Sequence, residues 1–296
     1  MASPALDAII AAKRANPFTP EKSVEQLRLE YSATISVEAM PKGTIITEVD
    51  AGGETAEWTR APGASTDRVF LFIHGGGYIR GAVPANRATA VLISAATGAT
   101  TLSVGYRLAP EHPFPAAVDD VHGAYRWLLA QNVEPKRVVV GGISAGGGLT
   151  LSLLLKLRDL GDPMCAAAVP MSAWTDLTQS GQSFIANDDS DPSLSKTYLD
   201  AMAAYYLNGA DPRTPLASPL YGELGGLPPL LIQVGTAEVL LDDSRLFAER
   251  AKAAGTEVTY EPWQDMIHGW HGFANVLPEA RDAIDSIGRF FKRHVN

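Results

Sequence analysis

The sequence predicts an α/β fold, in which a mainly parallel β-sheet carries helices on both faces. Short apolar runs rich in β-branched residues alternate with helix-like stretches from about residue 69 to residue 171, and the alternation resumes at residue 230. Regular alternation of strand and helix is typical of a parallel sheet that is covered on both sides. The chain has 296 residues, of which 46% are hydrophobic and 19% charged, so it can bury a substantial core.

The predicted elements follow from hydrophobic periodicity and from the residues that bound each run. Strands are expected at residues 69–73, 100–104, 137–140, 166–171, 230–234 and 258–260. Helices are expected at residues 84–97, 115–129, 146–160, 243–254 and 278–294. No internal repeat, low-complexity segment or linker divides the chain, so residues 1–296 are predicted to form a single domain.

Two segments fall outside this alternation. Near the N-terminus, Thr19 is expected to cap a helix that has Pro20 at its first position. The interval from about residue 177 to residue 219 contains several prolines and one predicted helix, at residues 193–207. We expect this insertion and the N-terminal segment, about residues 1–45, to form a cap over the functional site.

The charge balance argues against two classes of protein. Lys and Arg number 24 against 33 Asp and Glu, which gives a formal net charge of -9. A nucleic-acid partner would need a basic face, and a polybasic membrane anchor would need clustered cations. One uncharged run, residues 138–155, approaches the length of a membrane span, but its five glycines predict a strand, a sharp turn and a buried helix instead.

Cysteine usage and the N-terminus bear on the compartment. Cys165 is the only cysteine, so the chain can form no internal disulfide, and its apolar neighbours predict a small buried side chain rather than a nucleophile. Residues 1–14 carry Asp7 inside their apolar stretch and basic residues after it, which is the reverse of a secretory signal. We therefore expect a cytoplasmic protein.

The run Gly142-Ile143-Ser144-Ala145-Gly146 lies between a predicted strand and a predicted helix. This is the context of a nucleophile elbow, where a serine projects from a strained turn and glycines on both sides prevent collisions. A phosphate loop is the alternative, but no Lys-Ser/Thr pair follows, and Ile143 stands where a dinucleotide-binding loop needs glycine. Ser144 is therefore the candidate nucleophile.

A second glycine-rich motif, residues 74–77, comes directly after the predicted strand at residues 69–73 and reads His-Gly-Gly-Gly. Backbone N–H groups can face a developing oxyanion closely where no Cβ intervenes. Gly75 and Gly76, together with the N–H of Ala145, are therefore the candidate oxyanion hole. Three adjacent glycines could also form only a flexible loop, yet the two motifs in this order on successive strands favour the catalytic interpretation.

The base and the acid are expected after later strands. His268, which lies in a loop before Gly269, is the candidate general base, and His271 is its competitor. Glu238 follows the strand at residues 230–234 and is the candidate acid that accepts the imidazole Nδ1–H. Asp242 and Asp243 are alternatives, although capping the next helix explains them. The His-x-x-His pair has no third ligand at helical spacing, so no metal is expected.

With these motifs the chain resembles the bacterial esterases of the hormone-sensitive lipase family of α/β-hydrolases. The segments that carry the resemblance are residues 74–78, 106–117, 142–147, 235–243 and 265–268. The resemblance implies an eight-stranded sheet, a helical cap, no cofactor and hydrolysis of short acyl esters. Members of the family are often homodimers through the last strand and helix.

Two residues depart from the family's pattern. The residue before the nucleophile is usually acidic but is Ile143 here, and the triad acid is usually aspartate but is Glu238 here. Neither change removes a group that the chemistry requires. Amides, acetyl groups and lactones are alternative substrates for the same triad. A receptor on this fold that binds a ligand without catalysis would typically lack the base histidine.

Overall fold

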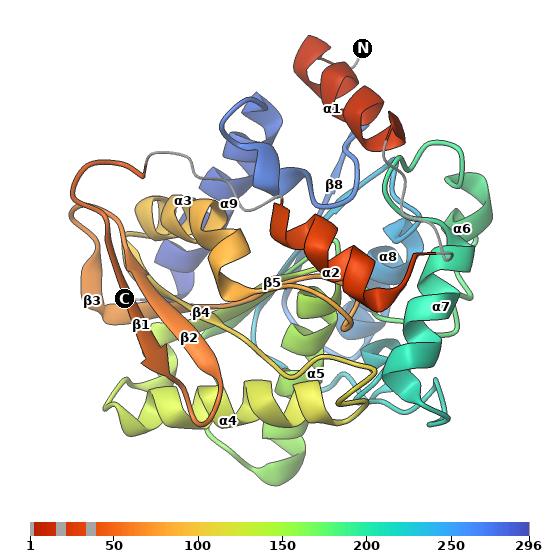
Figure 1. The fold of residues 1–296 in the computed structure, drawn as a ribbon. Coiled ribbons are helices and arrows are strands. Elements are labelled where there is room, and N and C mark those ends of the chain that lie inside the picture. The colour runs from red at the N-terminus through yellow and green to blue at the C-terminus, as the bar shows by residue number, and fades with distance from the viewer. Residues whose placement is uncertain (1–2, 16–21, 34–39, 296) are drawn as a thin grey trace.

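The protein is described here by a computed structural model that covers residues 3–15, 22–33 and 40–295 (Figure 1). Its centre is an eight-stranded sheet with the order β1-β2-β4-β3-β5-β6-β7-β8. The strands are β1 (Ile45–Asp50), β2 (Thr55–Arg60), β3 (Ser65–Ile73), β4 (Ala99–Val104), β5 (Val138–Ile143), β6 (Ala167–Met171), β7 (Leu230–Gly235) and β8 (Val258–Trp263). The predicted α/β fold with a mostly parallel sheet is confirmed.

Strands β1 and β2 form the antiparallel edge of the sheet and were not among the strands that periodicity predicts. β1 pairs with β2 and β2 pairs with β4 in antiparallel register, whereas the remaining strands are parallel to their neighbours. No residue of β1 is fully buried. An edge strand without a fully buried residue has little reason to carry the apolar pattern by which strands are recognised.

Nine helices in the described part of the chain surround the sheet. They are α1 (Pro4–Ala15), α2 (Val24–Ala33), α3 (Arg87–Thr97), α4 (Ala116–Ala130), α5 (Ala145–Leu160), α6 (Ser183–Ala186), α7 (Lys196–Leu207), α8 (Leu241–Ala253) and α9 (Pro278–His294). Short 3₁₀ helices occupy Val83–Asn86, Pro135–Arg137, Pro219–Tyr221 and Trp270–Phe273. Helices α4 and α5 cover one face of the sheet, and α3 and α9 cover the other (Figure 1).

Alternation along β3 divides the core between the two faces. Leu71 and Ile73 belong to the cluster that helices α4, α5 and α8 cover, whereas Phe70 and Phe72 pack with side chains of α3 and α9. Successive side chains of a strand point to opposite faces, so a strand buried on both sides is apolar throughout. The uncharged stretch at residues 138–155 forms β5 and most of α5, as predicted.

Several predicted boundaries move for local reasons. The helix that contains Leu27 begins at Val24, because Ser23 and Gln26 exchange hydrogen bonds in a capping box. Thr19 and Pro20, the predicted start of that helix, lie outside the described residues. The insertion's main helix begins at Lys196 rather than at residue 193, since Ser195 accepts a bond from the Tyr198 N–H.

The described parts of the two predicted cap segments contact loops at the carboxyl ends of the parallel strands. Leu6 of α1 packs with the segment that follows β8. In the insertion, Asn187 donates to the backbone carbonyl of Glu238. Helices α1, α2, α6 and α7 consequently lie along one side of the molecule, as Figure 1 shows. No helix in the described ranges combines the length and the apolarity that a membrane span requires.

The contact between α3 and α9 generates a test of the packing. Gly288 of α9 faces α3 so closely that a Cβ placed on it would lie 2.5 Å from the Ala96 carbonyl oxygen. Gly288→Ala should lower the free energy of unfolding by about 1–3 kcal/mol, because the two helices must separate. Urea denaturation measures this change.

Gly123, in the interior of α4, is the matched control because a Cβ there would meet nothing within 4 Å. Gly123→Ala should raise the free energy of unfolding by up to about 1 kcal/mol through helix propensity. Equal effects of the two substitutions would contradict the close approach of α3 and α9.

Candidate active site

Ser144 lies in the turn between β5 and α5, as the sequence predicts. Its backbone has φ 60° and ψ −120°, a conformation that non-glycine residues rarely adopt and that costs about 1–3 kcal/mol. The turn is held from both sides, because the Ser144 N–H donates to Met171 (2.9 Å) and its carbonyl accepts from the Trp174 N–H (3.1 Å). These bonds fix the direction in which the hydroxyl leaves the sheet.

Gly142 and Gly146 allow the turn to lie against the end of β3. A Cβ on Gly146 would overlap the Ile73 carbonyl oxygen and would lie 2.5 Å from that of His74. A Cβ on Gly142 would lie 2.7 Å from the same Ile73 oxygen. Because these neighbours are backbone atoms, they cannot move aside as a side chain could. The two glycines therefore bring the nucleophile and the loop after β3 together.

Residues 74–81, which we call the oxyanion loop, pass directly beside Ser144. A Cβ on Gly75 would lie 3.2 Å from the Ser144 Cβ. Gly76 has φ 126°, which favours glycine, and a Cβ there would overlap the Arg80 carbonyl oxygen. Among the described residues, no protein acceptor is found for the N–H groups of Gly75, Gly76 or Ala145. Three backbone donors are thus available in the oxyanion loop and directly after Ser144.

His74, the first residue of the oxyanion loop, has a structural role. Its ring stacks on Tyr106 with centroids 4.3 Å apart, and its Nδ1 lies 2.8 Å from the Gly75 carbonyl oxygen. Burial lowers the pKa of His74 to about 4, so the ring is neutral at physiological pH. The neutral ring supports the loop through packing and one hydrogen bond.

Glu238 and His268 form a hydrogen-bonded pair. The His268 Nδ1 lies 2.8 Å from the Glu238 Oε2, and the Glu238 side chain has no solvent exposure. The second carboxylate oxygen, Oε1, accepts from the Gly235 N–H (2.6 Å) and from the Ser172 hydroxyl (2.7 Å). An ionised carboxylate can only accept, so Nδ1 donates and leaves Nε2 as the basic nitrogen of His268.

The strand order explains why these residues share one edge of the sheet. Strands β5, β6, β7 and β8 are consecutive neighbours in the sheet and run parallel. Ser144, Ser172, Glu238 and His268 each follow the carboxyl end of one of them. Carboxyl ends of parallel strands share one edge of a sheet, where ligands of open α/β folds bind.

The rival candidates have other partners. Asp243 accepts from the backbone N–H groups of Thr175 and Asp176, and Asp242 accepts from the Ser183 N–H. His271 is fully buried, bonds Gln233 through Nε2 (3.0 Å) and lies against the Trp270 ring. None of the three rivals takes part in the pair that Glu238 and His268 form.

Two residues of the site were missed in the sequence. Ser172 donates to Glu238, and Asp191 accepts from the N–H groups of Ser193 and Val239, which ties the insertion to the loop that carries Glu238. Burial raises the pKa of the Asp191 carboxyl. Nearby His268 opposes this rise in pKa, and Glu238 reinforces it. Asp191 is one of three aspartates within residues 188–191, and nothing local in the sequence identified which of them contacts the loop that carries Glu238.

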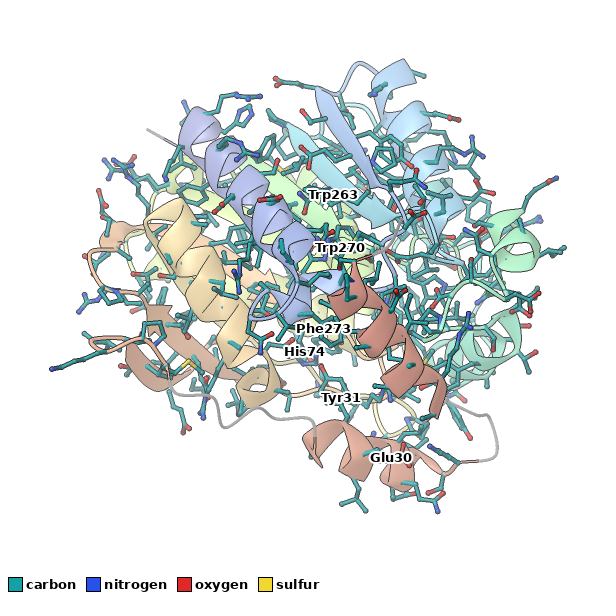
Figure 2. The ribbon with its side chains drawn as sticks, turned by 90° about the horizontal axis from the view of Figure 1, so that it is seen from above. Glu30, Tyr31, His74, Trp263, Trp270 and Phe273 are labelled. Atoms are coloured by element: carbon teal, nitrogen blue, oxygen red, sulfur yellow. The ribbon has the colours of Figure 1, made fainter. Side chains whose placement is uncertain are left out.

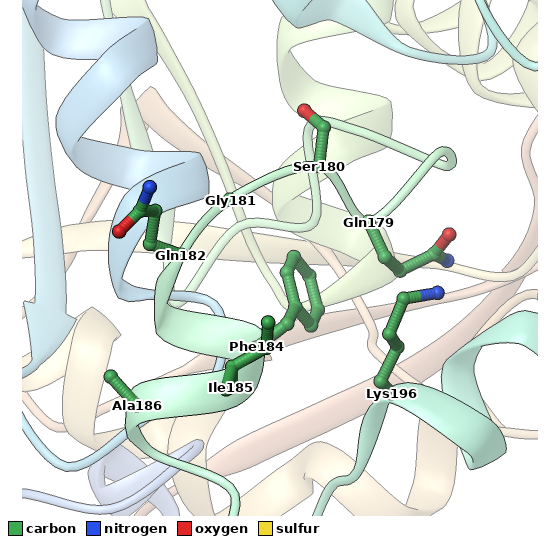
Figure 3. Close-up of a pocket in the computed structure, with 8 residues that line it drawn as sticks. All are labelled: Gln179, Ser180, Gly181, Gln182, Phe184, Ile185, Ala186 and Lys196. Carbon is green, nitrogen blue, oxygen red and sulfur yellow. The ribbon is translucent and has the colours of Figure 1, made fainter.

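Other features of the described chain lie apart from this chemistry. The hollow in Figure 3 is lined by residues of the insertion, Gln179, Ser180, Gly181, Gln182, Phe184, Ile185, Ala186 and Lys196, and by none of the three candidate catalytic residues. Cys165 is buried as predicted, which raises the pKa of its thiol to about 12. No cluster of three His, Cys, Asp or Glu side chains that could hold a metal occurs in the described ranges.

Comparison with known proteins defines the class. Residues 70–272 match the family model of the alpha/beta hydrolase fold. The chain is 44% identical to an acetyl-hydrolase of Streptomyces hygroscopicus over 99% of this chain and 97% of that protein. It is 35% identical to an esterase of Acinetobacter venetianus over 83% of this chain and 81% of that protein. The chain therefore belongs to the alpha/beta hydrolase fold family.

Solved structures narrow the class further. A crystal structure of an esterase from the bacterial hormone-sensitive lipase family aligns over 100% of both chains with a TM-score of 0.96 and 45% identity. An esterase/lipase from an uncultured bacterium aligns over 99% of both chains with a TM-score of 0.94 and 43% identity. The resemblance to this family of esterases is confirmed, and the prediction of a serine carboxylesterase agrees with the names of these relatives.

The burial of His271 leads to a prediction of how the stability of the protein depends on pH. Burial lowers the pKa of His271 from 6.5 to about 3, so below about pH 6.5 the unfolded chain binds a proton that the folded chain does not. Stability should therefore fall on acidification, by about 1.4 kcal/mol per pH unit for this residue. In His271→Gln, the slope of unfolding free energy between pH 6.5 and about pH 4.5 should be smaller by that amount.

Urea titrations of wild type and variant at several pH values provide the measurement. Above about pH 7.5 the difference between the two proteins should be independent of pH, because His271 is then neutral in both states. Parallel slopes throughout would show that this histidine is protonated in the folded protein.

Proposed function

We propose that the protein is a carboxylesterase that hydrolyses short-chain acyl esters through an acyl-enzyme intermediate. Ser144 is the nucleophile, His268 the general base and Glu238 the acid that orients it. The observation that carries the proposal is the contact of 2.8 Å between His268 Nδ1 and the buried Glu238 Oε2, made at the sheet edge where the turn of Ser144 lies.

In the first half of the cycle, Ser144 is acylated. His268 Nε2 accepts the hydroxyl proton as Oγ attacks the ester carbonyl carbon, and the carbonyl oxygen becomes an oxyanion. The N–H groups of Gly75, Gly76 and Ala145 stabilise that oxyanion, and each good donor contributes about 3 kcal/mol. The imidazolium then gives its proton to the alcohol oxygen, which leaves as the carbon–oxygen bond breaks.

In the second half, water replaces the alcohol. His268 takes a proton from the water, the resulting hydroxide attacks the acyl carbon, and Ser144 leaves with the proton returned. Glu238 keeps the imidazole in the tautomer with Nδ1 protonated and stabilises the imidazolium that forms twice in each cycle. The Ser172 and Gly235 bonds to its other oxygen hold the carboxylate in place for this role.

The contacts beside the oxyanion loop support a small acyl group. Gly77 has φ 62°, and a Cβ there would overlap the sulfur of Met202 from α7. The insertion thus packs directly against the oxyanion loop at Gly77. The relative named acetyl-hydrolase, which matches 99% of this chain, supports the same substrate class. We propose that the predicted cap, about residues 1–45 and 177–219, limits acyl length in this way.

The same triad could also cleave amides, lactones or acetyl groups on other carriers. Parallel assays with an aryl acetamide and a lactone distinguish these substrates from esters. The receptor alternative is disfavoured because the base histidine is present and its Nδ1 is paired with Glu238. We further propose a cytoplasmic location, which the single, buried Cys165 supports, and a homodimer through β8 and α9. Sedimentation analysis tests the dimer.

Hydrolysis of p-nitrophenyl esters from acetate to palmitate tests the proposal. Wild type should turn over acetate and butyrate fastest, and Ser144→Ala should reduce kcat by at least about 10⁴-fold because no covalent intermediate can form. Glu238→Gln should reduce kcat by about 10³- to 10⁴-fold, since the amide can present the wrong hydrogen-bonding atom to Nδ1. An aryl acetamide and a lactone are assayed in parallel.

His268→Gln and His271→Gln are the matched pair for the base. The first should abolish ester hydrolysis, and the second should leave kcat within about threefold while it lowers stability. Loss of activity in both, with the second protein folded, would reassign the base. A folded wild type that cleaves the amide or lactone but no ester would replace the proposed substrate class.

A further inference from the structure

Helix α2 makes direct polar contact with the oxyanion loop through one side chain. Arg28 donates from Nε to the Ile79 carbonyl oxygen (2.8 Å) and from one terminal nitrogen to the Ala109 carbonyl oxygen (3.0 Å). Both terminal nitrogens also bond the Glu111 carboxylate, at 2.8 and 2.7 Å. One planar guanidinium thus joins α2 to the loop after β3 and to the loop after β4.

The Ile79 carbonyl belongs to the turn that closes on Gly76. The N–H groups of Ile79 and Arg80 both donate to the Gly76 carbonyl oxygen, at 3.3 and 3.2 Å. Tyr78, in the same turn, has φ 64° and accepts from the Ala109 N–H (2.9 Å). The Ile79 carbonyl and the Arg80 N–H belong to the same peptide group. A bond to this carbonyl therefore fixes the N–H that holds the Gly76 carbonyl oxygen. The Gly76 carbonyl in turn sets the direction of the neighbouring backbone N–H groups of the loop.

A second contact links the same elements. The Arg80 guanidinium lies 5.5 Å from the ring centroid of Tyr31 on α2 and 5.9 Å from that of Tyr198 on α7. Figure 2 shows Tyr31 and Glu30 on α2 and His74 on the oxyanion loop from above. Cation–π contacts at a site this buried contribute about 1–2 kcal/mol. Helix α2 thus contacts the oxyanion loop at two points, the Ile79 carbonyl oxygen and the Arg80 side chain.

We propose that Arg28 is a positioning residue for the oxyanion hole, so that the N-terminal helix α2 takes part in catalysis by fixing the oxyanion loop. This rests on the proposed esterase function for its kinetic consequence, but the coupling between α2 and the loop is independent of it. The alternative is an ordinary surface ion pair with Glu111, which is 52% exposed and would contribute little.

The chemistry of the side chain separates these two interpretations. A lysine at position 28 would keep a positive charge for Glu111, but its single nitrogen cannot reach the three acceptors of a guanidinium fork. Arg28→Lys therefore preserves the ion pair and removes the carbonyl bonds. Glu111→Gln does the reverse, since it removes the charge partner and leaves the bonds to Ile79 and Ala109.

Kinetics with p-nitrophenyl acetate test the proposal. Arg28→Lys should lower kcat by about 10- to 100-fold with KM changed less than about threefold, because a misplaced donor affects the oxyanion more than the ground-state ester. Glu111→Gln should lower kcat less than about threefold. Lys22→Gln, which breaks the ion pair between Lys22, just before α2, and Glu30 on α2, is the matched control and should behave as wild type.

Hydrogen–deuterium exchange of the full chain separates this inference from the proposed function. Amides of residues 76–81 should exchange faster in Arg28→Lys than in wild type or Lys22→Gln, whether or not the protein cleaves esters. Unchanged exchange there, or a kcat within twofold of wild type in a folded Arg28→Lys, would overturn the inference. Faster exchange in a chain that hydrolyses no ester would keep the coupling and reject the esterase proposal.

Discussion

The backbone at the end of β3 and the first turn of α5 touch without any side chain between them, and the arrangement of the site depends on this contact. Any Cβ at Gly146 would overlap the Ile73 carbonyl oxygen, so the two segments approach as closely as peptide groups can. The approach places Gly75 beside the Ser144 Cβ. With a larger residue at Gly146 the turn and the oxyanion loop would separate, and Ser144 would lose the backbone donors of that loop.

Such a site stores unfavourable free energy that the surrounding sheet must offset. Ser144 adopts a strained backbone, and the carboxylates of Glu238, Asp191 and Asp243 are removed from water. Each carboxylate accepts at least two hydrogen bonds, several of them from backbone N–H groups whose positions the fold already determines. Donors fixed by the fold need no reorganisation when charge develops, which is why the strain is compatible with catalysis.

The sequence allowed the catalytic motifs to be predicted because each is a local backbone requirement. A glycine-flanked serine between strand and helix specifies its own turn, and parallel strands then bring the residues after them to one edge. The sequence favoured His268 over His271, and their different partners in the structure support that choice. Ser172, which lies 66 residues from Glu238 in the chain, has no local signal that could reveal the bond it makes. Contacts of that kind arise from strand order and not from periodicity.

The surroundings of Ile143, which precedes Ser144 and departs from the family's pattern, are apolar. It is half-buried, it packs at the edge of the cluster that α3 and α9 cover, and its Cγ2 lies 3.2 Å from where a Cβ of Gly75 would be. A carboxylate at this position would bring a negative charge close to the oxyanion loop. The isoleucine side chain lies beside Gly75 and brings no charge to the loop. In this chain, the oxyanion loop therefore has the apolar Ile143 beside Gly75 and the Arg28 guanidinium bonded to the Ile79 carbonyl oxygen.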